Sequence, residues 1–246
     1  MAQHSKDAPA DTLEQLQSLG DRLVGWVSAN PALVLGTAAA ILLVAASIGG
    51  VRAWRGSAAD SASAALATIQ REYLAAMGAE PGSTEAPEPA NPETARQVRT
   101  DFVERFTSFA KEHAGTPAQA LAALEASQLY EDLGASDPAL AVVQEAAAAL
   151  PADSAIRGVA LRRVASLVES AGDYEAAAQA HLAAADTPGY PLRSDALADA
   201  ARCWAEAAKV DEALALYARL QSEAPDYQLP PHVRARLSEL EAARGR

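Results

Sequence analysis

The chain has 246 residues, enough for one ordinary domain with an appendage or for one extended solenoid. Half of the residues are hydrophobic but only 5% are aromatic, and alanine dominates, a composition that favours close-packed helices over sheets. The formal net charge of -12, with no basic stripe, argues against binding to the phosphates of a nucleic acid.

Residues 1–30 are predicted to form a cytosolic tail and an interfacial segment. The part up to Gly20 is polar and mixed in charge. Residues 21–30 place Trp26 among leucine and valine residues, and tryptophan prefers the headgroup level of a bilayer. We therefore expect this segment to approach a membrane surface.

Residues 31–55 are predicted to form a transmembrane helix. No charged residue occurs from Leu23 to Val51, and roughly 20 apolar residues suffice to cross the hydrocarbon core. Arg52, Trp54 and Arg55 would anchor the far end of this helix at the interface. A cleavable signal peptide is the alternative, but the apolar run starts far from the N-terminus and follows an acidic region.

The charges around the apolar run give little information on its orientation. Lys6 and Arg22 precede it, whereas Arg52, Arg55 and Arg71 follow it. A simple count favours a cytosolic C-terminus by one charge, and long domains can cross a membrane regardless of such a bias.

Two connecting segments follow. Residues 56–78 are predicted to form a juxtamembrane helix, because apolar residues recur there at helical spacing. Residues 79–91 are rich in Pro, Gly, Ser and Glu and lack periodicity, which predicts a flexible acidic linker.

Residues 92–246 are predicted to form a tetratricopeptide-like domain, an α-solenoid of about three helical hairpins plus capping helices. One helix-turn-helix pattern occurs three times, with spacings of 38 and then 36 residues. This period is typical of helical repeat arrays, and an irregular all-α domain is the alternative. The equivalent residues of the three copies are Tyr130, Val168 and Trp204; Gly134, Gly172 and Ala208; Ala139, Ala177 and Ala213; Val143, His181 and Tyr217; Ala146, Ala184 and Leu220; and Pro151, Gly189 and Pro225.

Each set of equivalent residues has a mechanical role. The bulky residues of the first set fill the space between helices, and the glycines of the second end the first helix of a hairpin. The alanines of the third set allow two helices to approach closely. Proline after the second helix stops it.

Helix-capping residues mark several predicted helix ends. A helix is expected to start at Asn91–Pro92, with Phe102, Phe106 and Phe109 on one face. Thr116 and Gln119 predict a capping box at the first repeat, and Asp137–Pro138 is expected to open its second helix. A terminal capping helix is expected to turn Val233, Leu237 and Leu240 inward.

The sequence contains no motif for catalysis, cofactor binding or metal binding. A Gly-rich phosphate loop, H-E-x-x-H and G-x-S-x-G are all absent. His181 occupies the position of Val143 and Tyr217 in the other repeats, so a structural histidine is expected there. Cys203, the only cysteine, is expected to act as a small buried hydrophobic residue, and no Cys/His cluster has metal-ligand spacing in sequence.

A partner-binding groove is the one candidate site. Repeat arrays usually bind on the concave surface made by their first helices, and helical spacing predicts which polar residues lie there. A merely solvated polar face is the alternative. The candidate groove residues are Gln128, Glu131, Asp132, Arg162, Ser166, Glu169, Arg202 and Glu206.

The order of these segments resembles one known family. The chain runs from WVSANPALVLGTAAAILLVAASIGGVRAWRG through SASAAL and Tyr73 to FTSFAKEHAGTPAQALAALEASQLY. This layout resembles the YfgM-type ancillary subunit of the bacterial Sec translocon. The resemblance implies one inner-membrane helix, a cytoplasmic N-terminus and a periplasmic tetratricopeptide-like domain. It also implies protein partners among translocon subunits, membrane-anchored periplasmic chaperones and emerging polypeptides.

These observations together predict a non-enzymatic, membrane-anchored scaffold that assists protein export. For the orientation we follow the resemblance rather than the charge count. One alternative is a helical scaffold for another envelope complex, such as one for cell-wall synthesis or division. Another is an enzyme with a cryptic site, although no catalytic constellation is present in the motifs.

Overall fold

The computed structural model describes residues 59–244, and these belong to one compact unit, Ala59–Arg246. The segments expected to approach and cross a membrane, residues 1–30 and 31–55, lie outside the described residues. Among the described helices, none is both long and apolar enough to cross a membrane. In chain order the helices are residues 59–76, α3 (Pro92–Glu112), α4 (Pro117–Asp132), α5 (Ser136–Ala149), α6 (Ala155–Ser170), α7 (Tyr174–Ala185), α8 (Arg193–Glu206), α9 (Val210–Glu223) and α10 (Pro231–Arg244).

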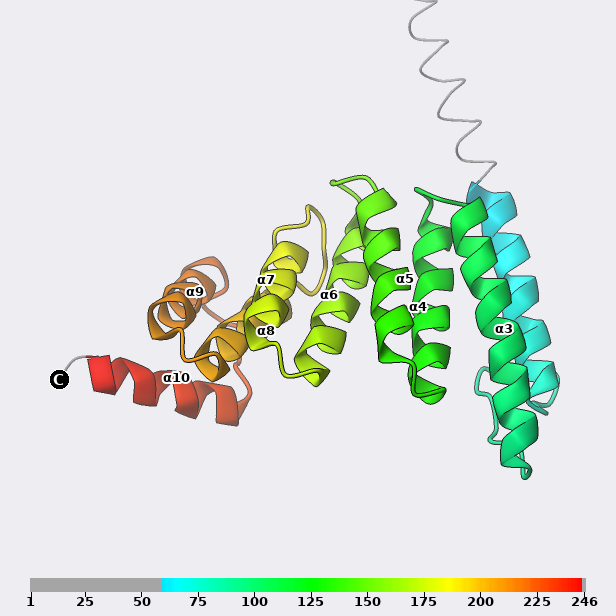
Figure 1. Cartoon of the computed structure of the whole chain (residues 1–246). Coiled ribbons are helices and arrows are strands. Elements are labelled where there is room, and N and C mark those ends of the chain that lie inside the picture. The colour runs from blue at the N-terminus through cyan, green and yellow to red at the C-terminus, as the bar shows by residue number, and fades with distance from the viewer. Residues whose placement is uncertain (1–58, 245–246) are drawn as a thin grey trace, which may run out of the picture. The chain divides into compact units, whose positions relative to one another are not determined.

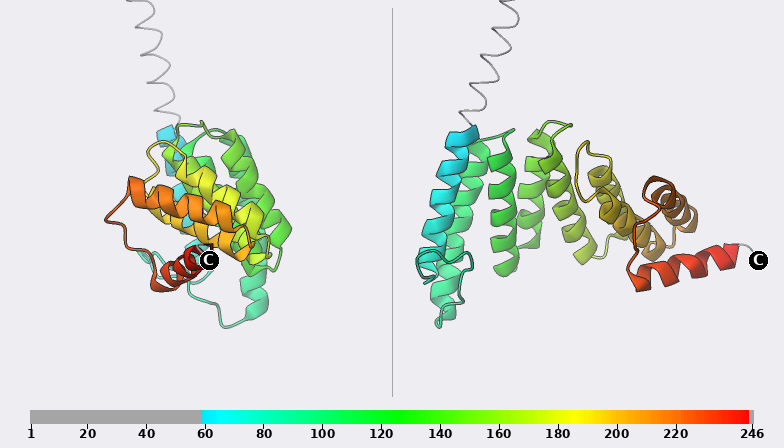
Figure 2. Two further views of the ribbon diagram at one scale, coloured as in Figure 1. Left: turned by 90° about the vertical axis from the view of Figure 1, so that its left-hand side faces the viewer. Right: turned by 180° about the vertical axis from the view of Figure 1, so that it is seen from behind.

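The helices of this unit stack one beside the next. From α3 to α10 each labelled helix packs against its successor (Figure 1), and the view from behind shows the same succession from the helix over residues 59–76 to α10 (Figure 2). Three hairpins, α4–α5, α6–α7 and α8–α9, make up the middle of the stack. The first helices α4 and α6 also contact each other across the hairpin boundary. The described residues thus confirm the predicted all-α, tetratricopeptide-like solenoid.

The first helix of each hairpin ends in the same way. Two residues beyond the helix, Gly134, Gly172 and Ala208 have positive φ angles of 75°, 84° and 58°. In each copy the amide after this residue donates to the carbonyl of the bulky repeat residue, Tyr130, Val168 or Trp204, at 2.8 to 3.0 Å. This is the Schellman arrangement of a helix C-terminus. Residues that the sequence aligned across the three repeats therefore make the same backbone hydrogen bonds in the structure.

Ala208 occupies a backbone conformation that favours glycine. We expect Ala208→Gly to raise the free energy of unfolding by about 0.5 to 1 kcal/mol, because relief of strain exceeds the added entropy of the unfolded chain. Gly172→Ala is the matched control and should lower stability by about 1 kcal/mol, since a Cβ there has no atom within 4 Å and only the backbone angle opposes it. Urea titrations of both variants measure the difference. A less stable Ala208→Gly protein would contradict the prediction.

The alanines predicted at the helix crossings are all buried. Ala139, Ala177 and Ala213 all have 0% of their surface exposed. One turn further along each second helix, the equivalent residues Val143, His181 and Tyr217 are buried as well. The second helices therefore pack through a small residue followed by a larger one, and His181 takes a core position.

The helix over residues 59–76 extends the array before α3. Its Ala62 and Leu66 are buried in the same cluster as the phenylalanines of α3. The ring of Tyr73 lies edge-on to Phe102, with ring centroids 5.4 Å apart, and to Phe106 at 6.4 Å. The compact unit therefore begins at Ala59, earlier than the residue 92 at which the sequence analysis places the start of the repeat domain.

The loop between this helix and α3 covers residues 77–91 and contains neither helix nor strand. It overlaps the linker expected at 79–91. Glu88 of the loop forms an ion pair with Arg99 of α3, which attaches the loop to the array.

Helix caps follow the sequence with two differences. Asn91 accepts from the amide of Glu93 at 3.0 Å, and Thr116 accepts from that of Gln119 at 3.2 Å, as predicted. The Gln119 side chain, however, accepts from the amide of Gly115 at 2.7 Å. Helix α5 begins at Ser136 rather than at Asp137–Pro138. The first turn of a helix tolerates Pro138, because the N–H groups of that turn have no partner within the helix and the missing N–H of proline costs nothing there.

Helix α10 closes the other end of the array. Val233 and Leu237 are buried in the cluster that α8 and α9 form, and Leu240 packs against it. This arrangement agrees with the predicted inner stripe of a terminal capping helix.

Candidate functional site

The helix over residues 59–76 and helices α4, α6 and α8 form a surface that we term the first-helix face. Polar side chains bridge its successive helices. Gln70 donates to Glu125 of α4 at 2.9 Å. Arg163 of α6 donates to Ser127 of α4 at 3.1 Å and forms an ion pair with Glu131. These contacts link one repeat to the next along the whole face.

The pair between Glu169 of α6 and Arg202 of α8 is the most complete of these bridges. Two parallel hydrogen bonds of 2.8 Å join the guanidinium to both carboxylate oxygens. Asp199 lies 3.3 Å from Arg162 and 3.7 Å from Arg202, so a second carboxylate balances the two arginines. The hydrogen bonds from Arg202 lower the pKa of Glu169, and those same bonds raise the pKa of Arg202. Such charge-assisted bidentate pairs fix geometry as well as adding stability.

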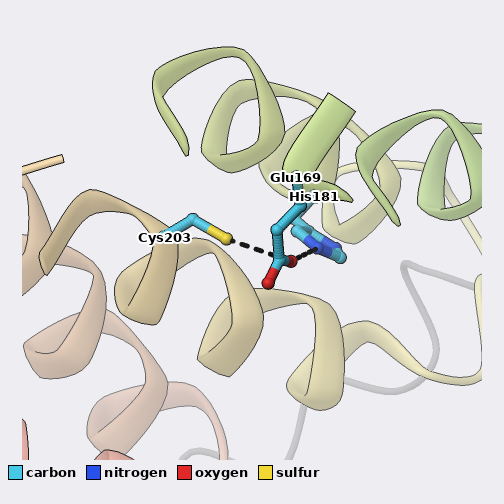
Figure 3. A group of neighbouring side chains, drawn as sticks. All are labelled: Glu169, His181 and Cys203. Carbon is cyan, nitrogen blue, oxygen red and sulfur yellow. Dashed lines mark hydrogen bonds and ion pairs between the residues drawn. The ribbon is translucent and has the colours of Figure 1, made fainter. Parts of the chain in front are cut away.

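Two further side chains meet the Glu169 carboxylate (Figure 3). The thiol of Cys203 on α8 donates to Glu169 Oε2 at 3.5 Å. His181 of α7 places Nε2 3.7 Å from the same oxygen, which is too long for a hydrogen bond. Burial lowers the pKa of His181 and raises the pKa of Cys203 to about 12, so both groups are neutral at pH 7. The buried thiol is therefore a poor nucleophile.

This cluster was missed in the sequence, where its members show no metal-ligand spacing. Glu169, His181 and Cys203 come from three helices, and only the packing of α6, α7 and α8 brings their ligand atoms within 4.8 Å of one another. Cys203 is buried, as predicted, and His181, for which a structural role was expected, takes a buried position.

The predicted groove residues divide into two groups. All eight lie on α4, α6 or α8, the helices on which they were expected. Glu131, Arg162, Glu169 and Arg202 are half-buried and form ion pairs with neighbouring helices. The other four are exposed, and they are Gln128, Asp132, Ser166 and Glu206. Partner binding by this set stays a prediction.

Sequence reasoning also omitted Arg163 and Asp199, which complete the bridges. A usable signal was present, because bridged residues of opposite charge stand about one repeat apart. Glu131 and Arg163 are separated by 32 residues, Arg162 and Asp199 by 37, and Glu169 and Arg202 by 33.

A hollow lies at the N-terminal end of the first-helix face. Its volume is about 500 Å³, and the helix over residues 59–76 and the following loop form most of its wall. Tyr73 and Leu74 give it an apolar lining, while Arg71 and Glu125 add charge. A hollow of this size can accommodate one or two side chains of a binding partner.

Comparison with known proteins gives a likeness of helix arrangement only. No protein family matches the chain, and no curated protein matches it significantly. One similar structure is the crystal structure of a protein from Podosopora anserina, assigned as a kinesin light chain and described as having nearly identical TPR-like repeats. Its TM-score against this chain is 0.45 and its sequence identity is 16%. The match covers 62% of this chain and 83% of that one. A single-substitution variant of the same protein has the same TM-score and identity and covers 62% and 82%.

Proposed function

We propose that this chain is a non-enzymatic protein-interaction scaffold that binds another polypeptide on its first-helix face. The observation that carries the proposal is the continuity of this face across the repeats. The bridges between α4, α6 and α8 hold the helices in a fixed relation, and the exposed polar residues stand beside those bridges. A fixed surface loses little entropy when it binds, which favours recognition of a flexible partner segment.

The exposed residues indicate the chemistry of that partner. Glu206 is acidic, Asp132 is acidic although it lies 3.4 Å from Arg99 of α3, and the chain carries a net charge of -12. Gln128 and Ser166 add neutral hydrogen-bonding groups. This surface therefore favours a polar or basic polypeptide segment over an acidic one.

The finer form of the proposal is an ancillary subunit of a bacterial Sec translocon, anchored in the inner membrane by residues 31–55. Support comes from the uncharged apolar run before the helical array and from the resemblance in segment order. In this role the repeat domain lies in the periplasm and binds translocon subunits, membrane-anchored chaperones or emerging chains.

Site-specific photo-crosslinking in native membranes tests this function. A crosslinking residue at Ser166, exposed on α6, should capture a translocon subunit or an emerging chain. The matched control is Gln179, which is exposed on α7. Equal adducts from both positions would contradict binding on the first-helix face. Recovery of cell-wall enzymes without any translocon subunit would contradict the export role.

Maleimide labelling tests the proposed sidedness. Ser83 is exposed in the loop before α3, so a cysteine introduced there in a Cys203→Ser background is the probe. A membrane-impermeant maleimide should label it in cells whose outer membrane alone is permeabilised. Labelling only after lysis of the inner membrane would place the domain in the cytoplasm and rule out the periplasmic role.

A further inference from the structure

We propose that Glu169, His181 and Cys203 form a binding site for a divalent transition-metal ion of the Zn²⁺ type. Their carboxylate, imidazole and thiolate groups are a donor set that Zn²⁺ uses in proteins. The three residues lie on α6, α7 and α8, so a bound ion would join the second hairpin of the array to the third.

The three ligand atoms are close enough together to meet at one ion. Cys203 Sγ lies 3.5 Å and His181 Nε2 lies 3.7 Å from Glu169 Oε2. Ligand atoms around a tetrahedral Zn²⁺ lie about 3.3 to 3.6 Å apart, given bond lengths of about 2.0 to 2.3 Å. These two separations lie at or just above the upper edge of that range, and the ligand atoms of His181 and Cys203 lie within 4.8 Å of each other, so metal binding requires the side chains to close around the ion.

The imidazole of His181 supplies an independent observation. Its side chain is only 4% exposed, yet neither ring nitrogen has a hydrogen-bond partner among the described residues. Buried polar atoms are nearly always satisfied, and an ion ligand is one way to satisfy them. The side chain points toward the Glu169 carboxylate and the site that the three residues share (Figure 3).

Neighbouring charges hold the carboxylate in place. Arg202 donates to both Glu169 oxygens, and the Cys203 thiol donates to Oε2 as well. When that thiol loses its proton to a metal, the second lone-pair direction of Oε2 becomes available to the ion. Arg202 then acts as the outer partner that orients a metal ligand. Its positive charge and that of Arg162 oppose cation binding, and Asp199, which contacts both arginines, offsets part of that repulsion.

Ion entry and proton release are both accounted for. Glu169 and Arg202 have side-chain exposures of 27% and 22%, so the site reaches solvent on their side. As the metal–sulfur bond forms, the thiol proton passes to solvent, which makes binding weaker at lower pH. Three protein ligands leave a fourth position for water.

Cobalt(II) titration of the full-length protein tests the proposal. The protein is purified in detergent and stripped of metal with EDTA. We expect one Co²⁺ per chain with a thiolate-to-cobalt charge-transfer band, and Zn²⁺ should abolish that band by displacing the cobalt. Cys203 is the only cysteine, so the band reports on this site alone.

Two variants make the test specific. Cys203→Ala should lose the band. His181→Val should weaken Co²⁺ binding on the order of tenfold or more, and valine already fills the equivalent position at Val143. His232→Ala, at an exposed position on α10, is the control and should behave as the parent. Circular dichroism verifies that each protein is folded.

Thermal unfolding with and without Zn²⁺ gives a second readout. A Zn²⁺ concentration just sufficient to saturate the parent should raise the unfolding midpoints of the parent and of His232→Ala more than those of the two site variants, because ligand that binds only the folded state stabilises it in proportion to its affinity. The proposal would be overturned if the parent showed no charge-transfer band, or if the band were unchanged in His181→Val. Equal stabilisation of all four proteins would also overturn it, because it would indicate binding to surface carboxylates. None of these results would affect the crosslinking pattern on which the proposed scaffold function depends.

Discussion

Replacing Phe106 by alanine is expected to lower the free energy of unfolding of the unit Ala59–Arg246 by about 3 to 5 kcal/mol. Phe106 of α3 is fully buried, and its ring packs against Tyr73 of the helix over residues 59–76 and against Phe102 of α3. Removing the ring leaves a cavity that a backbone of packed helices cannot close. Phe106 also lies at the end of the array, where the helix over residues 59–76 covers the apolar side of α3. The ends of repeat arrays depend on such covering helices for their stability.

The control for this variant is Leu121→Ala. Leu121 lies nearby on α4 but is 42% exposed, so its truncation should change stability by no more than about 0.5 kcal/mol. Urea titration followed by circular dichroism gives both values. Similar losses for the two variants would show that Phe106 is not packed as described, and that the helix over residues 59–76 does not form part of the array core.

Ala177→Leu is expected to be the other strongly destabilising change, at about 1 to 3 kcal/mol. Ala177 is fully buried in a small cluster with Ala178 and Cys203, against Val168 and Trp204. A leucine there adds three carbon atoms inside this buried cluster, which forces the helices apart or the side chain into a strained rotamer.

Ala183→Leu on the same helix is its control. Ala183 is exposed on α7, so the larger side chain extends into solvent and should change stability by about 0.5 kcal/mol or less. Both midpoints can be read from circular dichroism. In the unit Ala59–Arg246, Trp204 is the only one of the chain's three tryptophans, so its fluorescence gives a local readout of the cluster on which it packs. Equal melting temperatures would refute the repeat register and every assignment of a residue to the first-helix face.

The repeat register could be read from the sequence because it depends on local chemistry. Gly134 and Gly172 mark left-handed helix ends, and their equivalent Ala208 adopts the same backbone conformation without being glycine. Pro151 and Pro225 lie just beyond the second helices they were expected to stop. Helix ends are set by the residues at those ends, so a single chain displays them.

The role of the helix over residues 59–76 was decided by tertiary packing. The sequence predicts a helix there from its apolar spacing, but it also places an acidic loop rich in proline between that helix and α3. Local composition says nothing about which surface an apolar stripe covers. Only the structure shows that Leu66 and Tyr73 meet the phenylalanines of α3.

For the candidate site, the sequence determined which helices carry the predicted groove residues, and the tertiary structure decided what the side chains on them contact. Helical spacing is enough to place Glu169 and Arg202 on successive first helices. Whether they reach each other depends on the separation and angle of α6 and α8, which result from the packing of the whole array. For the same reason His181 could be recognised as a structural repeat position, while its approach to Glu169 and Cys203 required three helices to be placed in space.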